Sequence, residues 1–386
     1  MIGPGSTAIV GQAESTEIGT VPHLSAPGLA LNAASNAWAD AGLSPDDVDG
    51  VTCAYFPVAD ISRQLGIFPT WADNTQVGGC SWMLQLRSAI AAINAGYCRT
   101  VLIVYGESGR SHPVLATTYD GAKPGGMANQ FDQFYAGGTP AVLFSLNLVR
   151  YMQTYGLTEE QLAAGPVNQR RWAATVPRAT LRDPITIGEV LDSPMIAWPL
   201  RRAMCCLVSD AGGALIVTSA DRAVDFPKPP VYILGSGAAI EGGVMSPAGV
   251  RDPLHPEYIR TSGTAAFTSA GITQGDVDHL MIYDAFAHNP IFGLEGLGFV
   301  GYGEAGAFIA EGHTAPGGML PMNTNGGGMS YAHSGSYGML CMLESIRQVR
   351  GEAANQIPDV EIALCHGWGG VWSACATFVF SRSRSS

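Results

Sequence analysis

Charge is scarce in this sequence. Of its 386 residues only 13% are charged and 47% are hydrophobic, and the net charge is −12. With so few charged side chains to cover a surface, we expect layered packing and association into a homodimer or larger oligomer. The 20 Lys and Arg residues form no basic stretch interleaved with aromatics, so nucleic acid is not an expected partner.

The sequence also lacks the marks of a secreted, metal-binding or membrane protein. Its eight cysteines include no CxxC pair, which argues against a zinc site and against a disulfide framework. No apolar run reaches the length of a membrane span. The first residues lack the basic segment and apolar core of a signal peptide. We therefore expect a cytoplasmic protein with free thiols, no metal and no membrane association.

Strand-like and helix-like segments alternate along most of the chain, which predicts an α/β fold. Residues 108–200 differ, because they are rich in Pro, Gly and polar side chains. We interpret them as an excursion outside the sheet, interrupted by helices near 140–155 and 158–175. Elsewhere, strands are expected at 6–11, 48–55, 100–107 and 212–223, and helices at 27–42 and 81–95.

One part of the sequence echoes another. AGLSPDDVDGVTCAY (41–55) resembles AGITQGDVDHLMIYD (270–284), and each is followed later by a Gly-rich turn that opens a helix. Such a repeated order predicts two similar α/β halves. The Pro-rich segment 226–230 reads as the linker between them. The halves are then 1–225, with the excursion inside, and 226–386.

Cys80 stands where a helix begins, behind Gly78 and Gly79. A helix N-terminus carries partial positive charge and free N–H groups, which favour a thiolate and can hold an oxyanion. The glycines allow close approach of backbone and substrate. The alternative is a buried structural cysteine, a common fate of this residue type.

Two further residues lie at positions where α/β proteins commonly carry functional residues. His333 sits in a Gly/Ser-rich loop ahead of a helix, where a histidine can act as base or oxyanion donor. Tyr283 ends the echoed strand, and strand ends are common sites of function. A surface histidine and a tyrosine at the core edge are the alternatives.

Near the C-terminus, Cys365-His366-Gly367-Trp368-Gly369-Gly370 follows an apolar strand. Either His366 or Cys365 could supply a second acid/base, and a glycine turn beside a buried cysteine is the alternative.

Taken together, these features resemble the thiolase superfamily over nearly the whole chain. The family's nucleophilic cysteine starts a buried helix that ends in glycine, as Cys80 to Gly96 does here. Its NEAF or HDCF motif is similar to Tyr283-Asp284-Ala285-Phe286. Its asparagine- and glycine-rich motif ending in GHP is similar to residues 323–333, which aligns His333 with the catalytic histidine.

The resemblance implies a thiolase fold: two βαβαβ halves forming a five-layer αβαβα sandwich with an inserted loop domain. It also implies coenzyme A as acyl carrier, a homodimer and, in the sterol-carrier-protein-x-like branch, a small zinc-ribbon/OB-fold partner of the DUF35 type. No residues of this sequence can be assigned to binding the coenzyme.

Departures from the family pattern leave the chemistry open. Tyr283 replaces the family's Asn or His, as in the Ltp2-type aldolases of this branch, while Cys80 and His333 keep the thiolase pair. The resemblance therefore implies thiolase-type making or cleaving of a C–C bond through a Cys80 acyl-enzyme, with His366 or Cys365 as second acid/base. A retro-aldol lyase that uses Tyr283 and His333 is the alternative, and a non-catalytic scaffold subunit is a third.

Overall fold

The computed structural model describes residues 4–113, 139–242 and 250–384. One mixed sheet of nine strands, in the order β3-β2-β4-β7-β1-β8-β11-β10-β9, runs through the molecule. Five strands come from the first half: β1 (Thr7–Glu14), β2 (Gly50–Cys53), β3 (Trp71–Asp73), β4 (Thr100–Ser108) and β7 (Asp210–Ser219). Four come from the second: β8 (Val231–Ile240), β9 (His279–Ile282), β10 (Ile362–Gly369) and β11 (Ala374–Ser381).

The two parts of the sheet follow the same plan. In the first half β2 and β4 are parallel, and β4, β7 and β1 pair antiparallel. In the second, β9 and β10 are parallel, and β10, β11 and β8 pair antiparallel. Within the described strands, the two parts of the sheet join only where Ala8 and Ile9 face Tyr232 and Val231, after which the twist of the strands separates them.

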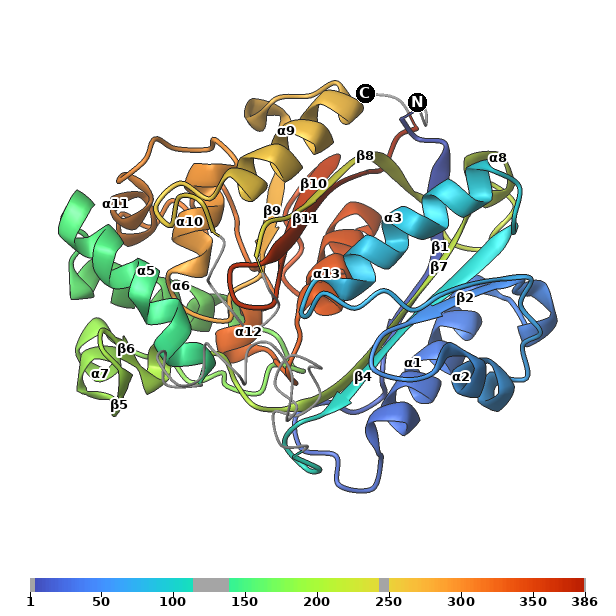
Figure 1. Ribbon diagram of the computed structural model, residues 1–386, viewed down its shortest axis with the longest axis horizontal. Coiled ribbons are helices and arrows are strands. Elements are labelled where there is room, and N and C mark those ends of the chain that lie inside the picture. Colours follow the sequence, from blue (N-terminus) through green and yellow to red (C-terminus); the bar gives the residue numbers. More distant parts are fainter. Residues whose placement is uncertain (1–3, 114–138, 243–249, 385–386) are drawn as a thin grey trace.

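Helices complete the expected five layers (Figure 1). Helix α1 (Ala26–Ala41) covers one outer face, against β1, β4 and β7, and α9 (Glu257–Ala270) covers the other, against β8 and β11. Helices α3 (Ser81–Asn94) and α13 (Gly338–Arg350) pack against each other between the sheets. The short helices α2 (Val58–Leu65) and α8 (Ala220–Ala223) lie in the first half.

The sequence echo has a matching structure in each half. Ser44 and Asp47 form a capping box, and so do Thr273 and Asp276, each with a hydroxyl-to-carboxylate distance of 2.8 Å. Strands β2 and β9 follow these turns. The internal similarity predicted from the sequence is therefore also present in the backbone structure.

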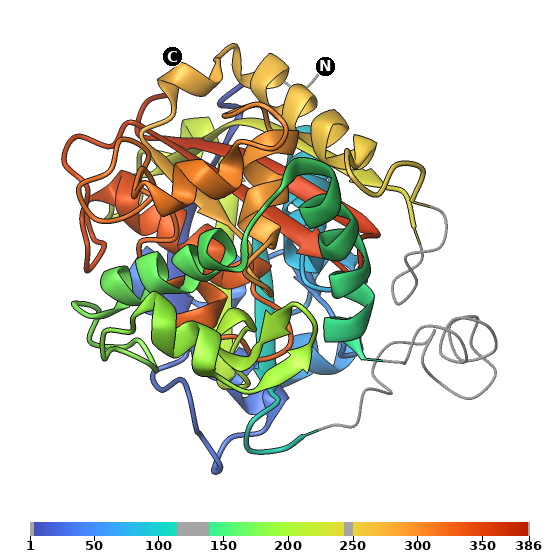
Figure 2. The same cartoon turned by 90° about the vertical axis from the view of Figure 1, so that its left-hand side faces the viewer.

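The described part of the excursion forms a helical layer beside the second half (Figure 2). It contains α5 (Pro140–Tyr155), α6 (Glu159–Ala173), α7 (Ile187–Asp192) and a two-stranded hairpin of β5 (Met195–Ala197) and β6 (Leu200–Arg201). Helix α6 packs against α11 (Ala305–Ala310) and α12 (Gly327–Ser330), and α10 (Asn289–Gly296) lies next to α11. The segment 114–138 lies outside the described residues.

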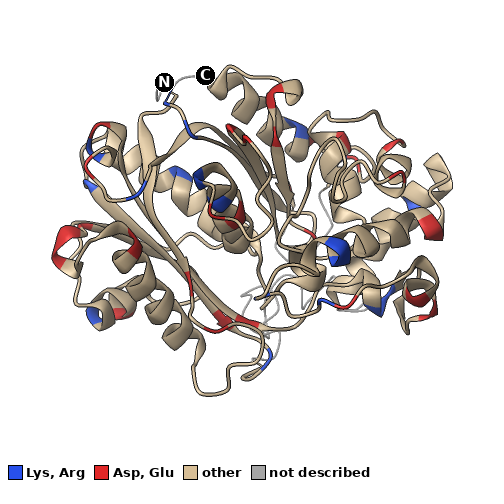
Figure 3. Cartoon of the chain, turned by 180° about the vertical axis from the view of Figure 1, so that it is seen from behind, with Lys and Arg blue, Asp and Glu red and all other residues tan. Residues whose placement is uncertain are grey.

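Acidic and basic residues are thinly scattered over the ribbon, and long stretches of the strands carry neither (Figure 3). Within the described residues, no helix is long and apolar enough to cross a membrane.

Candidate active site

Cys80 lies at the N-terminal end of α3, inside the central layer, with an exposed fraction of 0%. The turn before it is fixed locally. Gly78 adopts a φ of +82°, and the Ser81 hydroxyl donates to the Gly78 carbonyl at 2.6 Å and accepts from the Val77 N–H at 3.0 Å. Burial raises the pKa of the Cys80 thiol well above its usual value, although its own backbone N–H favours the thiolate. The resting residue is therefore a thiol, contrary to the expectation from the helix terminus alone.

Tyr283 and His333 form a hydrogen-bonded pair. The Tyr283 hydroxyl lies 2.8 Å from Nε2 of His333, and the two residues are 5% and 6% exposed. Ser209 fixes the histidine backbone, because its hydroxyl accepts from the His333 N–H at 2.8 Å and its N–H donates to the His333 carbonyl at 3.0 Å.

The surroundings of His333 define its protonation. Burial lowers the pKa of His333 to about 4, so the ring is neutral at neutral pH. The Gly335 N–H points to Nδ1 at 3.4 Å, which makes Nδ1 an acceptor and leaves the ring proton on Nε2. We therefore assign His333 as the donor to the Tyr283 oxygen, which leaves the Tyr283 hydroxyl proton for another acceptor.

Tyr283 also reaches the segment that carries Cys80. A Cβ at Gly79 would lie 2.3 Å from Cε1 and 2.8 Å from the hydroxyl oxygen of Tyr283. The tyrosine ring thus packs directly on the residue before Cys80. Gly338 of α13 donates its N–H to the Gly79 carbonyl at 3.1 Å. The structure brings together three of the four predicted site residues: Cys80, Tyr283 and His333.

His366 lies apart from these three. A Cβ at Gly369 would lie 2.8 Å from the Cys80 sulfur, and one at Gly367 would lie 3.4 Å from its Cβ, so these glycines face α3. His366 points to the opposite face of β10, because strand residues alternate. There its Nδ1 lies 2.8 Å from the Thr377 hydroxyl, which contacts Ser262 of α9. Burial lowers the pKa of His366 to about 3.

Cys365 shares the inner face with the two glycines, where it contacts Cys341 of α13.

Two residues that hold the site were not singled out from the sequence. Asp284 is fully buried and accepts the N–H groups of Gly328 and Met329 at 2.7 and 3.3 Å, and burial raises its pKa to about 7. It anchors the Gly-rich turn ahead of His333, as Ser209 anchors His333 itself. The sequence did carry signals for both residues. They are the acidic residue directly after Tyr283 and the run Ser209-Asp210-Ala211-Gly212-Gly213.

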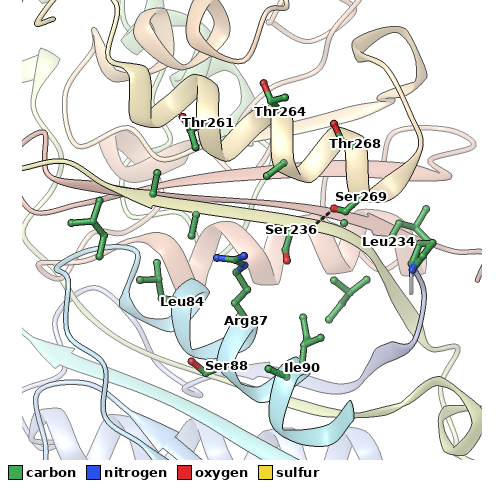
Figure 4. Close-up of a pocket in the computed structure, with 18 of the residues that line it drawn as sticks. Leu84, Arg87, Ser88, Ile90, Leu234, Ser236, Thr261, Thr264, Thr268 and Ser269 are labelled. Atoms are coloured by element: carbon green, nitrogen blue, oxygen red, sulfur yellow. Dashed lines mark hydrogen bonds between the residues drawn. The ribbon is translucent and has the colours of Figure 1, made fainter. Parts of the chain in front are cut away.

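A wide groove in the described residues lies elsewhere. It has a volume of about 1420 Å³ and runs between α3, β8 and α9 (Figure 4). Arg87 and Ser88 of α3, Ser236 of β8 and Thr264 of α9 line it. None of the predicted site residues does. Among the described residues, no group of three or more His, Cys, Asp or Glu side chains is arranged to hold a metal ion.

Comparison with known proteins gives consistent family matches. Residues 246–382 match the family model "Thiolase C-terminal domain-like". The chain is 34% identical over 383 residues, 95% of this chain and 97% of the relative, to 17-hydroxy-3-oxo-4-pregnene-20-carboxyl-CoA lyase of Mycobacterium tuberculosis. It is 30% identical over 392 residues, 97% of this chain and 99% of the relative, to acetyl-CoA acetyltransferase of Methanothermobacter thermautotrophicus.

Solved structures agree. The Ltp2-ChsH2(DUF35) aldolase matches with a TM-score of 0.88 and 30% identity, covering 99% of both chains. Human mitochondrial 3-ketoacyl-CoA thiolase matches with a TM-score of 0.71 at 15% identity, over 97% of this chain and 98% of that one, which shows the shared fold. These findings confirm the resemblance and the thiolase fold predicted from the sequence. The chain belongs to the thiolase superfamily, in the branch of sterol-carrier-protein thiolase-like enzymes and steroid side-chain-cleaving aldolases.

Proposed function

We propose that this thiolase-superfamily enzyme cleaves a bulky 3-hydroxyacyl-CoA ester by a retro-aldol reaction, with Tyr283 as acid/base. The observation that carries the proposal is the buried hydrogen bond of 2.8 Å between the Tyr283 hydroxyl and Nε2 of His333, in which we assign the histidine as the donor. A donor aimed at a phenol oxygen stabilises its anion and leaves its lone pairs or proton for the substrate. Similarity to the M. tuberculosis lyase over most of both chains supports the same reaction class.

The step balances without an external oxidant or reductant. The Tyr283 oxygen, as tyrosinate, takes the proton of the substrate's 3-hydroxyl group, C3 becomes a carbonyl, and the C2–C3 bond breaks. Its electron pair forms the enolate of the shorter acyl-CoA. The Tyr283 hydroxyl then returns the proton to C2. The backbone N–H of Cys80, at the start of α3, is suited to the enolate oxygen, whereas those of Ser81 and Met83 bond to the Gly78 and Cys80 carbonyls.

Thiolase-type chemistry through a Cys80 acyl-enzyme is the second candidate. The position of Cys80 at the start of α3, with Gly367 and Gly369 against it, favours it. This mechanism also needs a group to move the proton at the α-carbon. Of the two residues considered for that role, His366 faces α9 and Cys365 contacts Cys341 of α13, which is why we rank thiolase chemistry second.

The test compares wild type, Cys80→Ala and Tyr283→Phe in two measurements. One is turnover of the CoA ester named in the M. tuberculosis lyase, and the other is intact mass after exposure to acyl-CoA and 3-ketoacyl-CoA esters. Cleavage by wild type and Cys80→Ala but not by Tyr283→Phe is the expected result. An acyl adduct on wild type alone, with thiolysis lost in Cys80→Ala, would establish the thiolase instead. A folded protein with neither activity on these esters would favour the scaffold subunit.

The partners are part of the same proposal. We propose that the chain acts on coenzyme A esters as a homodimer and with a small DUF35-type subunit, in the cytoplasm. The solved complex of a related aldolase with a DUF35 protein supports the second chain. The open groove between α3, β8 and α9 offers a surface for association. All eight cysteines are unpaired, as in a reducing compartment. Light scattering with and without the co-expressed subunit tests the assembly.

A further inference from the structure

The loop that follows His333 is attached to the first half of the chain. The Tyr105 hydroxyl of β4 contacts the Ser334 hydroxyl and donates to the Ser336 carbonyl at 3.0 Å. The Tyr55 hydroxyl lies 3.3 Å from the Ser336 hydroxyl. A loop of the second half that carries a site residue is thus held by side chains of the first.

Trp82 ties these tyrosines to the helix that starts at Cys80. Its ring makes edge contacts with Tyr55 at 5.5 Å and with Tyr105 at 4.5 Å, and its Nε1–H donates to the Val104 carbonyl at 2.7 Å. The tryptophan is fully buried. The aromatic cluster of Tyr55, Trp82 and Tyr105 therefore supports the loop after His333. One acidic residue lies beside this cluster.

That residue is Glu107, two positions after Tyr105 on β4 and so on the same face. Its carboxyl lies beside Ser336 and Tyr105, whose polar groups favour the ionised form against the larger effect of burial. A Cβ at Gly335 would lie only 2.6 Å from its Oε1, and Gly335 has a φ of +131°. The carboxyl thus packs on the Gly335 backbone and fills the space that a side chain there would need.

Gly335 is the residue whose N–H faces Nδ1 of His333 at 3.4 Å. We infer that Glu107 is a positioning residue, which holds the loop Ser334–Ser336 so that the Gly335 N–H keeps the proton of His333 on Nε2, toward Tyr283. The inference rests on the proposed role of the Tyr283–His333 pair, but its readout does not depend on turnover.

The environment of Glu107 indicates which substitution should preserve its packing. Burial raises the pKa of Glu107 to about 8, so its carboxyl is mainly protonated at pH 7. Its Oε2 is buried and has no hydrogen-bond partner among the residues described. Gln has nearly the shape of a neutral carboxyl and the same number of heavy atoms. Glu107→Gln should therefore keep the loop in place, whereas Glu107→Ala removes the acceptor and opens a gap beside Gly335.

The test is long-range 1H–15N NMR of histidine-labelled full-length protein at pH 7, with His333→Gln used to identify the His333 signals. Wild type and Glu107→Gln should give the neutral Nε2–H form. Glu107→Ala should give a mixture of the two neutral forms. In turnover, where lyase activity is present, Glu107→Ala should lower kcat about tenfold or more with little change in KM, and Glu107→Gln should restore it.

Controls separate positioning from folding. Ser336→Ala removes a hydroxyl that favours the ionised form of Glu107 without opening a gap in β4, and should shift His333 in the same direction by less. Glu189→Gln, in the exposed capping box of α7, should change nothing. Unaltered His333 signals in both Glu107→Ala and Ser336→Ala, or in Ser336→Ala alone if Glu107→Ala does not fold, would overturn the inference. The absence of lyase activity would refute the proposed function and leave this readout intact.

Discussion

The sulfur of Cys80 faces the backbone of Gly369, so closely that a Cβ at Gly369 would lie 2.8 Å from it and 2.2 Å from the Val77 carbonyl oxygen. Strand β10 and the start of α3 therefore fit only when position 369 has no side chain. We predict that Gly369→Ala costs about 1–3 kcal/mol of stability, in the range of overpacked cores, and that it lowers turnover by shifting the start of α3, which we propose holds the enolate oxygen.

Thermal unfolding and turnover measure the two effects of Gly369→Ala. The matched control is Gly188→Ala in α7, where an added Cβ would meet only the Thr186 hydroxyl, at 4.0 Å. Alanine at Gly188 should be neutral or slightly stabilising. A melting temperature of Gly369→Ala equal to that of the control would contradict this packing.

The hydroxyl of Tyr283 should matter far more for turnover than for folding. Tyr283→Phe keeps the ring that packs on Gly79 and removes the group bonded to His333. We expect kcat to fall by about 10²–10⁴-fold, the usual contribution of a general acid or base, with a nearly unchanged melting temperature. Activity of Tyr283→Phe within a few fold of wild type would rule out the acid/base role.

A buried ion cluster joins β1 to the loop and helix on either side of the site. Glu14 accepts from the Tyr331 hydroxyl at 2.5 Å and from Arg347 at 2.7 Å, and pairs with Arg178 at 3.1 Å. Removing one member of a buried pair leaves the other charge unpaired. We predict that Glu14→Gln lowers the free energy of unfolding by about 3 kcal/mol, as measured by denaturant titration.

The same cluster has a pH signature. Burial alone would raise the pKa of Glu14, but Arg347, Arg178 and the Tyr331 hydrogen bond together lower it below its usual 4.5. Its stabilisation is therefore fully present above that value and is lost as pH falls through the depressed pKa. The stability difference between wild type and Glu14→Gln should shrink below about pH 4, and a constant difference down to pH 3 would contradict the assignment.

Protonation of the buried histidines should also destabilise the fold, at a higher pH than protonation of Glu14 does. Burial lowers the pKa of His279, His288 and His366 to about 3 and that of His333 to about 4, from 6.5. The unfolded chain therefore binds more protons between pH 6.5 and 3, and stability falls as pH decreases through this window. Each such histidine costs about 1.4 kcal/mol per pH unit there.

Glu107 and Asp284 act in the opposite sense, because burial raises their pKa values to about 8 and about 7, so the folded chain binds their protons more readily than the unfolded chain. The histidine contribution is therefore measured as the difference in stability between wild type and a variant that lacks one histidine, from pH 8 to 4.5. His279→Gln, which removes one of these groups away from the site, should reduce the loss of stability as pH falls. A stability difference between wild type and His279→Gln that does not change between pH 6.5 and 4.5 would show that His279 is not held neutral.

The sequence predicted those features that depend on local order. The echo of residues 41–55 in 270–284 located the turns and strands of both halves, because capping boxes and apolar strands are specified by a few consecutive residues. The helix start at Cys80 and the loop of His333 were likewise readable from glycine and helix patterns. Tyr283 was found because it ends an echoed strand.

Other features depend on packing between distant segments. Whether His366 faces α3 or α9 is fixed by the register of β10, since a shift of one residue exchanges the two faces. The raised pKa of Cys80 depends on how deeply α3 is enclosed between two sheets. The contact of Glu107 with Gly335 joins residues from opposite halves, for which the sequence carries no local signal.

The candidate site divides between the two similar halves. Cys80 and Glu107 come from the first, whereas Tyr283 and His333 come from the second. The second half carries Tyr283 and His333, and the first supplies Cys80 and the start of α3, so neither segment alone contains the whole site. If residues 1–225 and 226–386 were produced as separate polypeptides, turnover would require their reassociation. Recovered turnover would therefore measure how well the two halves bind each other.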